Sequence, residues 1–501
     1  MSRYTTWSFD SVLIRYAVLM TIWCTAVLYA CWRFAYTTSN LPLQVAGGFT
    51  DSMHGLTRKR DITHVEWNRV SKGLLSISAW FLLQPLLTQF FIRTFRKVPP
   101  CFYAMYTTTF LMLEYDLNIL LLQYAIYALM YLATTSKHRG VCYILFAVLY
   151  LGYKMDLTPS ILTHIMYRRG ADKGVLIDVG TCYAFLRSLS FALDCIERDT
   201  VPPLWKTLAY YLYLPNFFWG PLMNYSDFEQ ELDRPPTPWS FSKRSFGLFL
   251  NLVRCYVLYL FYNLHTHYFY HQVLSYHPHI VETLDAWSAA GFCFLSSFSI
   301  FLEYRIFLLL GESVAALDGL RLHPAPMCIA RLYSMAHLWK YFNRGFHLWA
   351  ARYFYIPFVG RDKPNGLKVI GAGLCFGIIW FGHNGGAAIS AWCSINCLTV
   401  LLEKFVIHFG TTCYGVSIQD RFPNLVRQLQ LILYTTSFLL VYMSNMFLAT
   451  GWRVPFIVFN KLICAPLPMV ALFMATYCGI CCSLEFQKKM TKRNRKCEHI
   501  R

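Results

Sequence analysis

The stretch Val369-Ile-Gly-Ala-Gly-Leu-Cys-Phe-Gly-Ile-Ile-Trp-Phe381-Gly-His383-Asn-Gly385-Gly386 decides the fold class, because it holds a long apolar run without a charged residue. Similar runs recur along the 501 residues, of which 56% are hydrophobic and 14% are charged. Soluble proteins carry about 25% charged residues. The sequence therefore predicts a polytopic integral membrane protein and excludes an ordinary soluble enzyme, a disordered tail protein and a nucleic-acid-binding domain.

Membrane-spanning helices of about 20 mostly apolar residues are expected along the whole chain. We predict an all-α protein with about ten spans and a few re-entrant segments. The strongest candidate spans are 12–32, 74–92, 117–134, 246–266, 288–310, 368–392, 428–449 and 455–482. Shorter or interrupted runs, some spanning and some re-entrant or interfacial, lie at 101–114, 141–153, 180–193, 206–223, 345–359 and 394–409.

The formal net charge of +19 belongs first to cytosolic loops and to contacts with anionic lipid headgroups. The tail 487–501 carries the strongest basic cluster, Lys488–Lys496, which predicts a cytosolic C-terminus. We find no internal repeat or low-complexity linker. One integral membrane domain over 1–501 is the simplest organisation.

The 18 cysteines lie mostly inside apolar runs, where a thiol packs as a small hydrophobic group. The chain therefore does not resemble a disulfide-rich secreted scaffold. Cys478 and Cys481 have C-x2-C spacing, but there is no second pair, so zinc is not predicted.

Ionisable residues inside apolar runs are costly, so each is first a functional hypothesis. Four groups of polar residues interrupt such runs: Glu114 with Asp116, Arg187 with Asp194, the segment 339–347, and the segment 380–386.

His383 has two interpretations from its position alone. A neutral imidazole in a water-poor cavity could accept a proton as a general base. A structural histidine, bonded to a neighbouring carbonyl, is the simpler interpretation and is favoured about two to one.

The segment 339–347 also leaves two interpretations open. Asn343 and His347 are one helical turn apart, as are Lys340 and Arg344, among several aromatic residues. This pattern fits either a polar site with an apolar wall or an amphipathic helix at the membrane interface. Farther along, Asn396 and Glu403 share one helix face with Trp392, and we expect both to make hydrogen bonds between helices.

At these two segments the sequence resembles the membrane-bound O-acyltransferase superfamily, and within it the Hedgehog acyltransferase branch. The fragments that carry the resemblance appear in order along most of the chain: 153–156, 186–191, 215–221, 326–329, 338–345, 353–357, 380–383, Trp392, 395–396 and Glu403. Each fragment is weak alone, and their shared order and spacing make the resemblance strong.

The resemblance implies an endoplasmic reticulum membrane enzyme that moves a long-chain fatty acyl group, palmitoyl in this branch, from acyl-CoA. The acceptor would be the N-terminal cysteine amine of a secreted Hedgehog-type protein. His383 would be the catalytic histidine, Trp339 would gate the acyl chain, and Cys328 would match a haem-ligating cysteine. Lys340 and Arg344 would meet the CoA phosphates from the cytosolic side. Acyl-CoA, the secreted acceptor and membrane lipids are thus the expected partners.

Asn343 departs from the family pattern, in which active members carry Asp at this position. An amide keeps a hydrogen bond but loses the charge that would stabilise an imidazolium. Three alternatives therefore accompany the acyltransferase hypothesis: a catalytically impaired regulator, an acyltransferase with a lipid or another protein as acceptor, and a transporter. The transporter is the weakest, because the sequence shows no clear inverted pair of broken helices.

Overall fold

A computed structural model describes residues 9–39, 41, 43, 45, 47–50, 58–157, 169–234, 241–359 and 365–498. These residues form a helical protein with one two-stranded antiparallel pair, β1 (Phe49–Thr50) and β2 (Arg60–Asp61), in which Phe49 pairs with Asp61. The prediction of an all-α polytopic membrane protein is confirmed.

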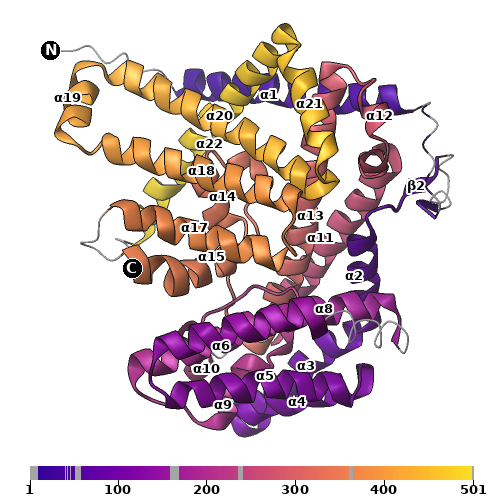
Figure 1. The fold of residues 1–501 in the computed structure, drawn as a ribbon, viewed down its shortest axis with the longest axis vertical. Helices are drawn as coiled ribbons and strands as arrows, with labels where there is room; N and C mark the ends of the chain where they lie inside the picture. The colour runs from indigo at the N-terminus through magenta and orange to yellow at the C-terminus, as the bar shows by residue number, and fades with distance from the viewer. Residues whose placement is uncertain are drawn as a thin grey trace.

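The helices form two groups in Figure 1. The lower group, in violet and magenta, contains α3 (Ser78–Phe95), α4 (Pro100–Glu114), α5 (Leu117–Thr135), α6 (Arg139–Gly152), α8 (Ala171–Arg198), α9 (Leu204–Tyr211) and α10 (Tyr225–Asp233). α2 (Val65–Ser76) packs against α8, and the π-helix η1 (Tyr153–Leu157) follows α6.

The upper group brings the N-terminal helix together with the C-terminal half of the chain (Figure 1). It contains α1 (Phe9–Thr38), α11 (Phe241–Tyr268), α12 (Pro278–Val281), α13 (Ala286–Asp318), α14 (Met335–Tyr341), α15 (Arg344–Ala350), α16 (Ile356–Val359), α17 (Asn365–Gly382), α18 (Ala387–Phe409), α19 (Cys413–Arg421), α20 (Pro423–Thr450), α21 (Arg453–Ile463) and α22 (Pro466–Glu498). Short 3-10 or π segments are η2 (Leu214–Asn216), η3 (Val273–Tyr276), η4 (Ile329–Arg331) and η5 (Ala351–Tyr355). α13 packs against α1, α11 and α20, and it also contacts α3 of the lower group.

Within the described ranges, eight helices are long and apolar enough to cross a membrane, and the bent pair α2–α3 (45°) brings the number to nine. The eight are α1, α5, α8, α11, α13, α18, α20 and α22. The number is close to the expected ten, but several boundaries differ.

The run 368–392 was predicted to be one span, and this prediction is wrong: the run forms two helices separated by a turn. α17 ends at Gly382 and α18 begins at Ala387, because Asn384, Gly385 and Gly386 take left-handed backbone angles (φ 62°, 64° and 92°). Such angles cannot continue a right-handed helix.

Other expected runs are also divided differently. The run 455–482 is broken between α21 and α22, where Pro466 starts the second helix. The runs 206–223 and 345–359 form only short helices, whereas 180–193 and 394–409 are parts of the spans α8 and α18.

Two of the four polar groups hold the scaffold together. Arg187 is fully buried, and its Nη1 donates to the carbonyl oxygens of Asn216 (2.7 Å) and Phe217 (3.3 Å). Asp194 accepts from the Ser226 amide (2.9 Å) and the Tyr353 hydroxyl (3.0 Å). Arg187 thereby holds the end of η2 against α8, and Asp194 holds the first turn of α10 and the π-helix η5.

The first polar group is structural as well. Glu114 accepts from Trp80 Nε1 (2.7 Å) and Lys173 Nζ (2.6 Å), and Asp116 caps α5 by accepting from the Ile119 amide. The cysteines whose side chains are described are free thiols. Among the residues that the structure describes, no group of three or more His, Cys, Asp or Glu side chains could hold a metal ion.

Candidate active site

His383 lies in the turn between α17 and α18, one residue after α17 ends. The turn closes on itself: the amides of His383, Asn384 and Gly385 donate to the carbonyls of Ile379, Phe381 and Trp380. The imidazole is therefore held by a fixed backbone turn, outside the spanning helices.

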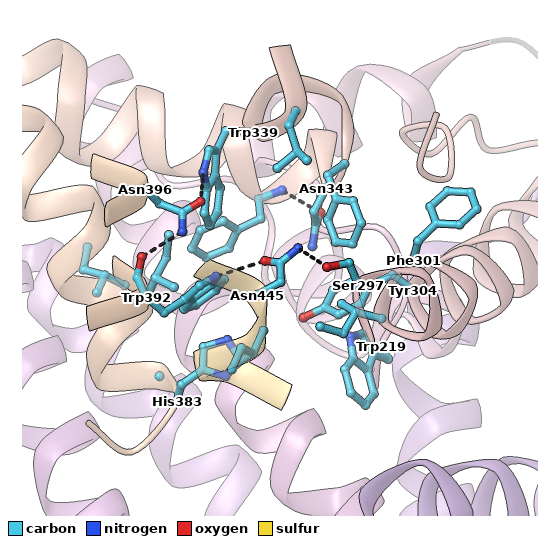
Figure 2. A pocket seen from close by; sticks show the side chains of 18 of the residues that line it. Trp219, Ser297, Phe301, Tyr304, Trp339, Asn343, His383, Trp392, Asn396 and Asn445 are labelled. Carbon is cyan, nitrogen blue, oxygen red and sulfur yellow. Dashed lines mark hydrogen bonds between the residues drawn. The ribbon is translucent and has the colours of Figure 1, made fainter. Parts of the chain in front are cut away.

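A cavity of about 400 Å³ opens in front of His383. Its size falls within the range of about 300–1,000 Å³ that is typical of small-molecule sites. Trp339, Asn343, His383, Trp392 and Asn396 all line it, so the structure brings together the two polar segments that the sequence singled out (Figure 2). Most of the remaining wall is aliphatic or aromatic.

Two indole–amide pairs fix the wall of this cavity. Trp339 Nε1 donates to Asn396 Oδ1 (3.0 Å), and the Asn396 amide donates to Ser444 Oγ (3.1 Å). The side chain of Asn396 thus links α14, α18 and α20, which confirms its expected role between helices.

The second pair involves the tryptophan next to His383. Trp392 Nε1 donates to Asn445 Oδ1 (3.2 Å), and the Asn445 amide donates to Ser297 Oγ (3.5 Å). The His383 ring meets Trp392 edge to face, with ring centroids 5.4 Å apart. Figure 2 shows these side chains converging on the cavity above His383.

Glu403, the other residue on this face of α18, also acts between helices as expected. Its two carboxylate oxygens accept from the backbone amides of Met335 (2.8 Å) and Ala336 (2.9 Å). The buried carboxylate therefore holds the first turn of α14, the helix that presents Trp339 to the cavity.

Asn343 caps the next helix. Its Oδ1 accepts from the Phe346 amide (3.2 Å) at the start of α15. Among the hydrogen bonds of the described residues none joins Asn343 to His383, and Figure 2 shows the two side chains on different sides of the cavity. The amide nitrogen is the donor end of Asn343, and it lies beside Tyr183 at the cavity wall.

The surroundings of His383 favour the neutral imidazole. His383 is accessible through the cavity. Protein atoms nevertheless surround the imidazole and take it partly out of water, and this burial lowers the pKa of His383. The positive charge of Lys154 lowers the same pKa further. A neutral ring has a free nitrogen lone pair that can accept a proton.

A neighbouring cavity of about 350 Å³ is basic and shares Phe301 with the His383 cavity. Arg305, Arg331 and Arg344 line it, together with Cys328, whose thiol is exposed. Lys340 is exposed, and it is not one of the residues that line either cavity.

A third cavity, of about 130 Å³, is also lined by His383, and two carboxylates, Glu66 and Glu303, lie in its wall. Glu66 lines both this cavity and the first one, whereas His64 and Glu303 line only the third. His64 Nδ1 is 3.0 Å from Glu303 Oε1. Burial lowers the pKa of His64, but the Glu303 carboxylate more than offsets this effect and raises the pKa to about 9.

Several site residues were missed at the level of sequence. Asn445 and Ser297 lie singly inside the spans α20 and α13, and Glu66 lies in the first turn of α2. The sequence marks these three residues only as polar side chains within or beside an apolar run. The motifs gave no indication of which residues they would contact.

Residues 102–444 match the model of MBOAT, the membrane-bound O-acyltransferase family. The chain is 25% identical over 325 residues to the protein-cysteine N-palmitoyltransferase Rasp of Drosophila melanogaster, covering 63% of this chain and 64% of the relative. It is 23% identical over 267 residues to protein-cysteine N-palmitoyltransferase HHAT of Mus musculus, covering 53% of each. It is also 23% identical over 365 residues, 70% of each chain, to the Mus musculus HHAT-like protein.

The chain spans less than two thirds of the length of the first two of these relatives. The resemblance predicted from the motifs is confirmed, both for the family and for the protein-cysteine N-palmitoyltransferase branch.

Proposed function

The chain belongs to the membrane-bound O-acyltransferase family, and from this premise we propose that it transfers a long-chain fatty acyl group, palmitoyl first, from acyl-CoA to the N-terminal cysteine amine of a secreted Hedgehog-type protein. The observation that carries this proposal is His383, held on a turn in the wall of a largely apolar cavity. The names of the relatives support a protein amine as the acceptor.

The reaction needs little activation of the donor, because a thioester is already reactive. The amine nitrogen attacks the thioester carbon, the C–N bond forms, and the C–S bond then breaks to release CoA. His383 takes a proton from the attacking nitrogen and passes it to the leaving thiolate, so the imidazole ends neutral. Positioning and exclusion of water supply most of the remaining acceleration.

The other polar groups support this step. The donor end of Asn343 faces the cavity and is suited to stabilise the oxyanion of the tetrahedral intermediate. The Asn445–Trp392 hydrogen bond holds the indole perpendicular to the His383 ring and so helps to fix the orientation of the imidazole.

The two side cavities suit the two substrates. Arg305, Arg331 and Arg344 match the phosphates of CoA, since guanidinium groups bind phosphate oxygens in pairs. The carboxylate of Glu66, which lines both the third cavity and the cavity of His383, suits the approach of a cationic amine from the third cavity. The acyl chain would then lie against Trp339 and the apolar wall.

Haem fits the chemistry of the basic cavity. The exposed Cys328 thiol is a haem-ligand type. The arginines that would pair with the haem propionates are the ones proposed for the CoA phosphates, so haem and CoA would compete for this cavity. Bound haem would supply redox chemistry that the acyl transfer does not use. The further proposals are residence in the endoplasmic reticulum and a cytosolic C-terminus, which would put the CoA side in the cytosol.

The test is transfer of labelled palmitoyl-CoA by the purified full chain onto peptides. Peptides with a free N-terminal Cys should be acylated, an N-terminal Ser peptide should be a weaker acceptor, and N-acetylated peptides should not react. His383→Ala should lower transfer by at least 10³-fold, because it removes the proton acceptor.

Cys482→Ala, a change at a buried thiol outside the cavity walls, serves as the control and should leave transfer unchanged. Wild-type transfer rates in His383→Ala would contradict the proposal. Acyl-CoA binding without any transfer in the wild type would identify the chain as a catalytically impaired regulator, and acylation of added lipid would identify a lipid acceptor.

A further inference from the structure

A separate cavity of about 420 Å³ lies where several helices of both groups end. The end of α3, the starts of α4, α9 and α11, and the ends of α10 and α13 meet there. It shares no lining residue with the cavity of His383 or with the basic cavity of Arg344. The proposed acyl transfer therefore makes no use of it.

Five basic residues line this cavity: Lys97, Lys206, Arg234, Arg244 and Arg321. They come from segments more than 200 residues apart in the chain, so the fold alone brings the charges together.

Three carboxylates share the cavity, but two of them are already paired. Lys206 Nζ lies 2.7 Å from Asp233 Oδ2, and Arg234 Nη2 lies 2.6 Å from Glu231 Oε1.

The third carboxylate, Asp318, accepts from Gln84 Nε2 (2.6 Å) and the Tyr213 hydroxyl (2.7 Å) at the buried end of the cavity. Lys97 and Arg321 are both exposed, and within the described part of the chain no ion pair joins either to a carboxylate. The mouth of the cavity thus keeps an excess of positive charge.

The cavity also lies at the ends of candidate membrane-spanning helices. α11 and α13 are candidate spans, and α3 is the second half of the bent span. Large apolar side chains on the helices that border the cavity are exposed: Phe95 on α3 (58%) and Phe246 on α11 (60%), each two residues along the chain from a lining residue. Ile92 and the buried Leu320 line the wall of the cavity itself.

We propose that this cavity binds the phosphorylated headgroup of an anionic membrane lipid, with Lys97 and Arg321 on the phosphate and the acyl chains along α3 and α11. Basic pockets between spanning helices are the usual sites for such headgroups. The exposed apolar residues of α3 and α11 favour a lipid over a soluble phosphate compound, because only a lipid carries chains to cover them.

The test is native mass spectrometry of the full chain in detergent, titrated with phosphatidylinositol 4-phosphate or with phosphatidylserine. We expect one phosphatidylinositol 4-phosphate to bind at least tenfold more tightly than phosphatidylserine. The double variant Lys97→Ala, Arg321→Ala should lose at least tenfold of this affinity, because each charge-assisted contact to phosphate is strong.

The charge-matched control is Arg421→Ala, Arg453→Ala, which removes two exposed cations that do not line this cavity and should bind like the wild type. Because Lys97 and Arg321 are exposed and outside the cavity of His383, the double variant should keep its thermal stability without added lipid.

The proposal fails if both lipids bind equally, or if the Lys97, Arg321 variant binds like the wild type. Soluble inositol 1,4-bisphosphate should displace the lipid only at far higher concentration. Displacement at equal concentration would assign the site to a free phosphate compound, and displacement by CoA would assign it to the acyl donor; either result overturns the lipid proposal. Binding is the readout throughout, so failure of the acyl-transfer proposal would not affect this test.

Discussion

Asn343 combines two contacts that a single side chain rarely provides. Its oxygen caps α15 through the Phe346 amide, while its nitrogen end borders the cavity beside Tyr183. An Asp at this position would cap the helix equally well, since Asn and Asp are similar N-caps. The difference between the two residues is therefore confined to the cavity.

Asn343→Asp should keep the thermal stability and lower kcat by roughly 10-fold to 10²-fold, because a carboxylate places negative charge where the oxyanion forms. Asn343→Ala also removes the cap of α15, so the free energy of unfolding should fall by about 1 kcal/mol. Steady-state transfer and thermal unfolding of both variants check this prediction. A several-fold rise in kcat for Asn343→Asp would show instead that the imidazole lacks a charged partner.

The pH dependence of transfer should follow the acceptor and not the enzyme. Burial and Lys154 lower the pKa of His383, so the imidazole is already neutral well below pH 7. An α-amino group has a pKa of about 7.7–8.0 and must lose its proton before attack. After division by the fraction of free amine, kcat/KM should stay flat from about pH 8 down to about pH 6. An inflection near pH 6.5 would show that the histidine titrates at its ordinary value.

At the scale of elements, the break between α17 and α18 places His383, and the sequence predicted it only in part. Two adjacent glycines, Gly385 and Gly386, weaken a helix at this point, but the apolar run continues past them and is expected to span as one helix. Hydropathy averages over a window, so it does not detect two or three residues with left-handed angles.

Gly385→Ala should lower kcat without abolishing folding. A Cβ there would lie 2.9 Å from Trp380 Cζ2, and the residue has a φ of +64° that alanine rarely adopts. The turn must shift, and His383 moves with it, so we expect a loss of roughly 10-fold or more.

The matched control is Gly377→Ala in α17, where a Cβ would meet nothing within 4 Å. This change should leave transfer intact and stabilise the helix by up to about 1 kcal/mol. Equal transfer rates for the two variants would show that the turn does not position the histidine.

At the scale of the whole molecule, composition predicted the membrane, the apolar runs predicted the helices, and the family motifs predicted which two polar segments carry the site. The long-range partners could not be predicted, because Ser297, Asn445 and Glu66 are single polar residues whose neighbours depend on helix packing. In the sequence all four polar groups interrupt apolar runs in the same way. In the structure two of them fix the scaffold and two line the cavity.

The ion pair of His64 and Glu303 ties the loop before α2 to α13. Folding raises the pKa of His64 to about 9, so the pair stabilises the protein fully below about pH 6.5 and the contribution is lost as pH rises through 9. The wild type should therefore exceed His64→Gln in Tm by roughly 1–3 °C at pH 6, and the gap should close by about pH 10. A gap that stays constant over this range would rule out the pair as its source.

His383 lines two cavities: the first, which Trp339 and Asn343 also line, and the third, which His64 and Glu303 also line. A donor in one and an acceptor in the other would meet at the same imidazole, and no nucleophilic side chain is needed to carry the acyl group between them. The kinetics should therefore be sequential: both substrates occupy the protein before either product leaves. Double-reciprocal plots at several acceptor concentrations would intersect, where a ping-pong enzyme would give parallel lines.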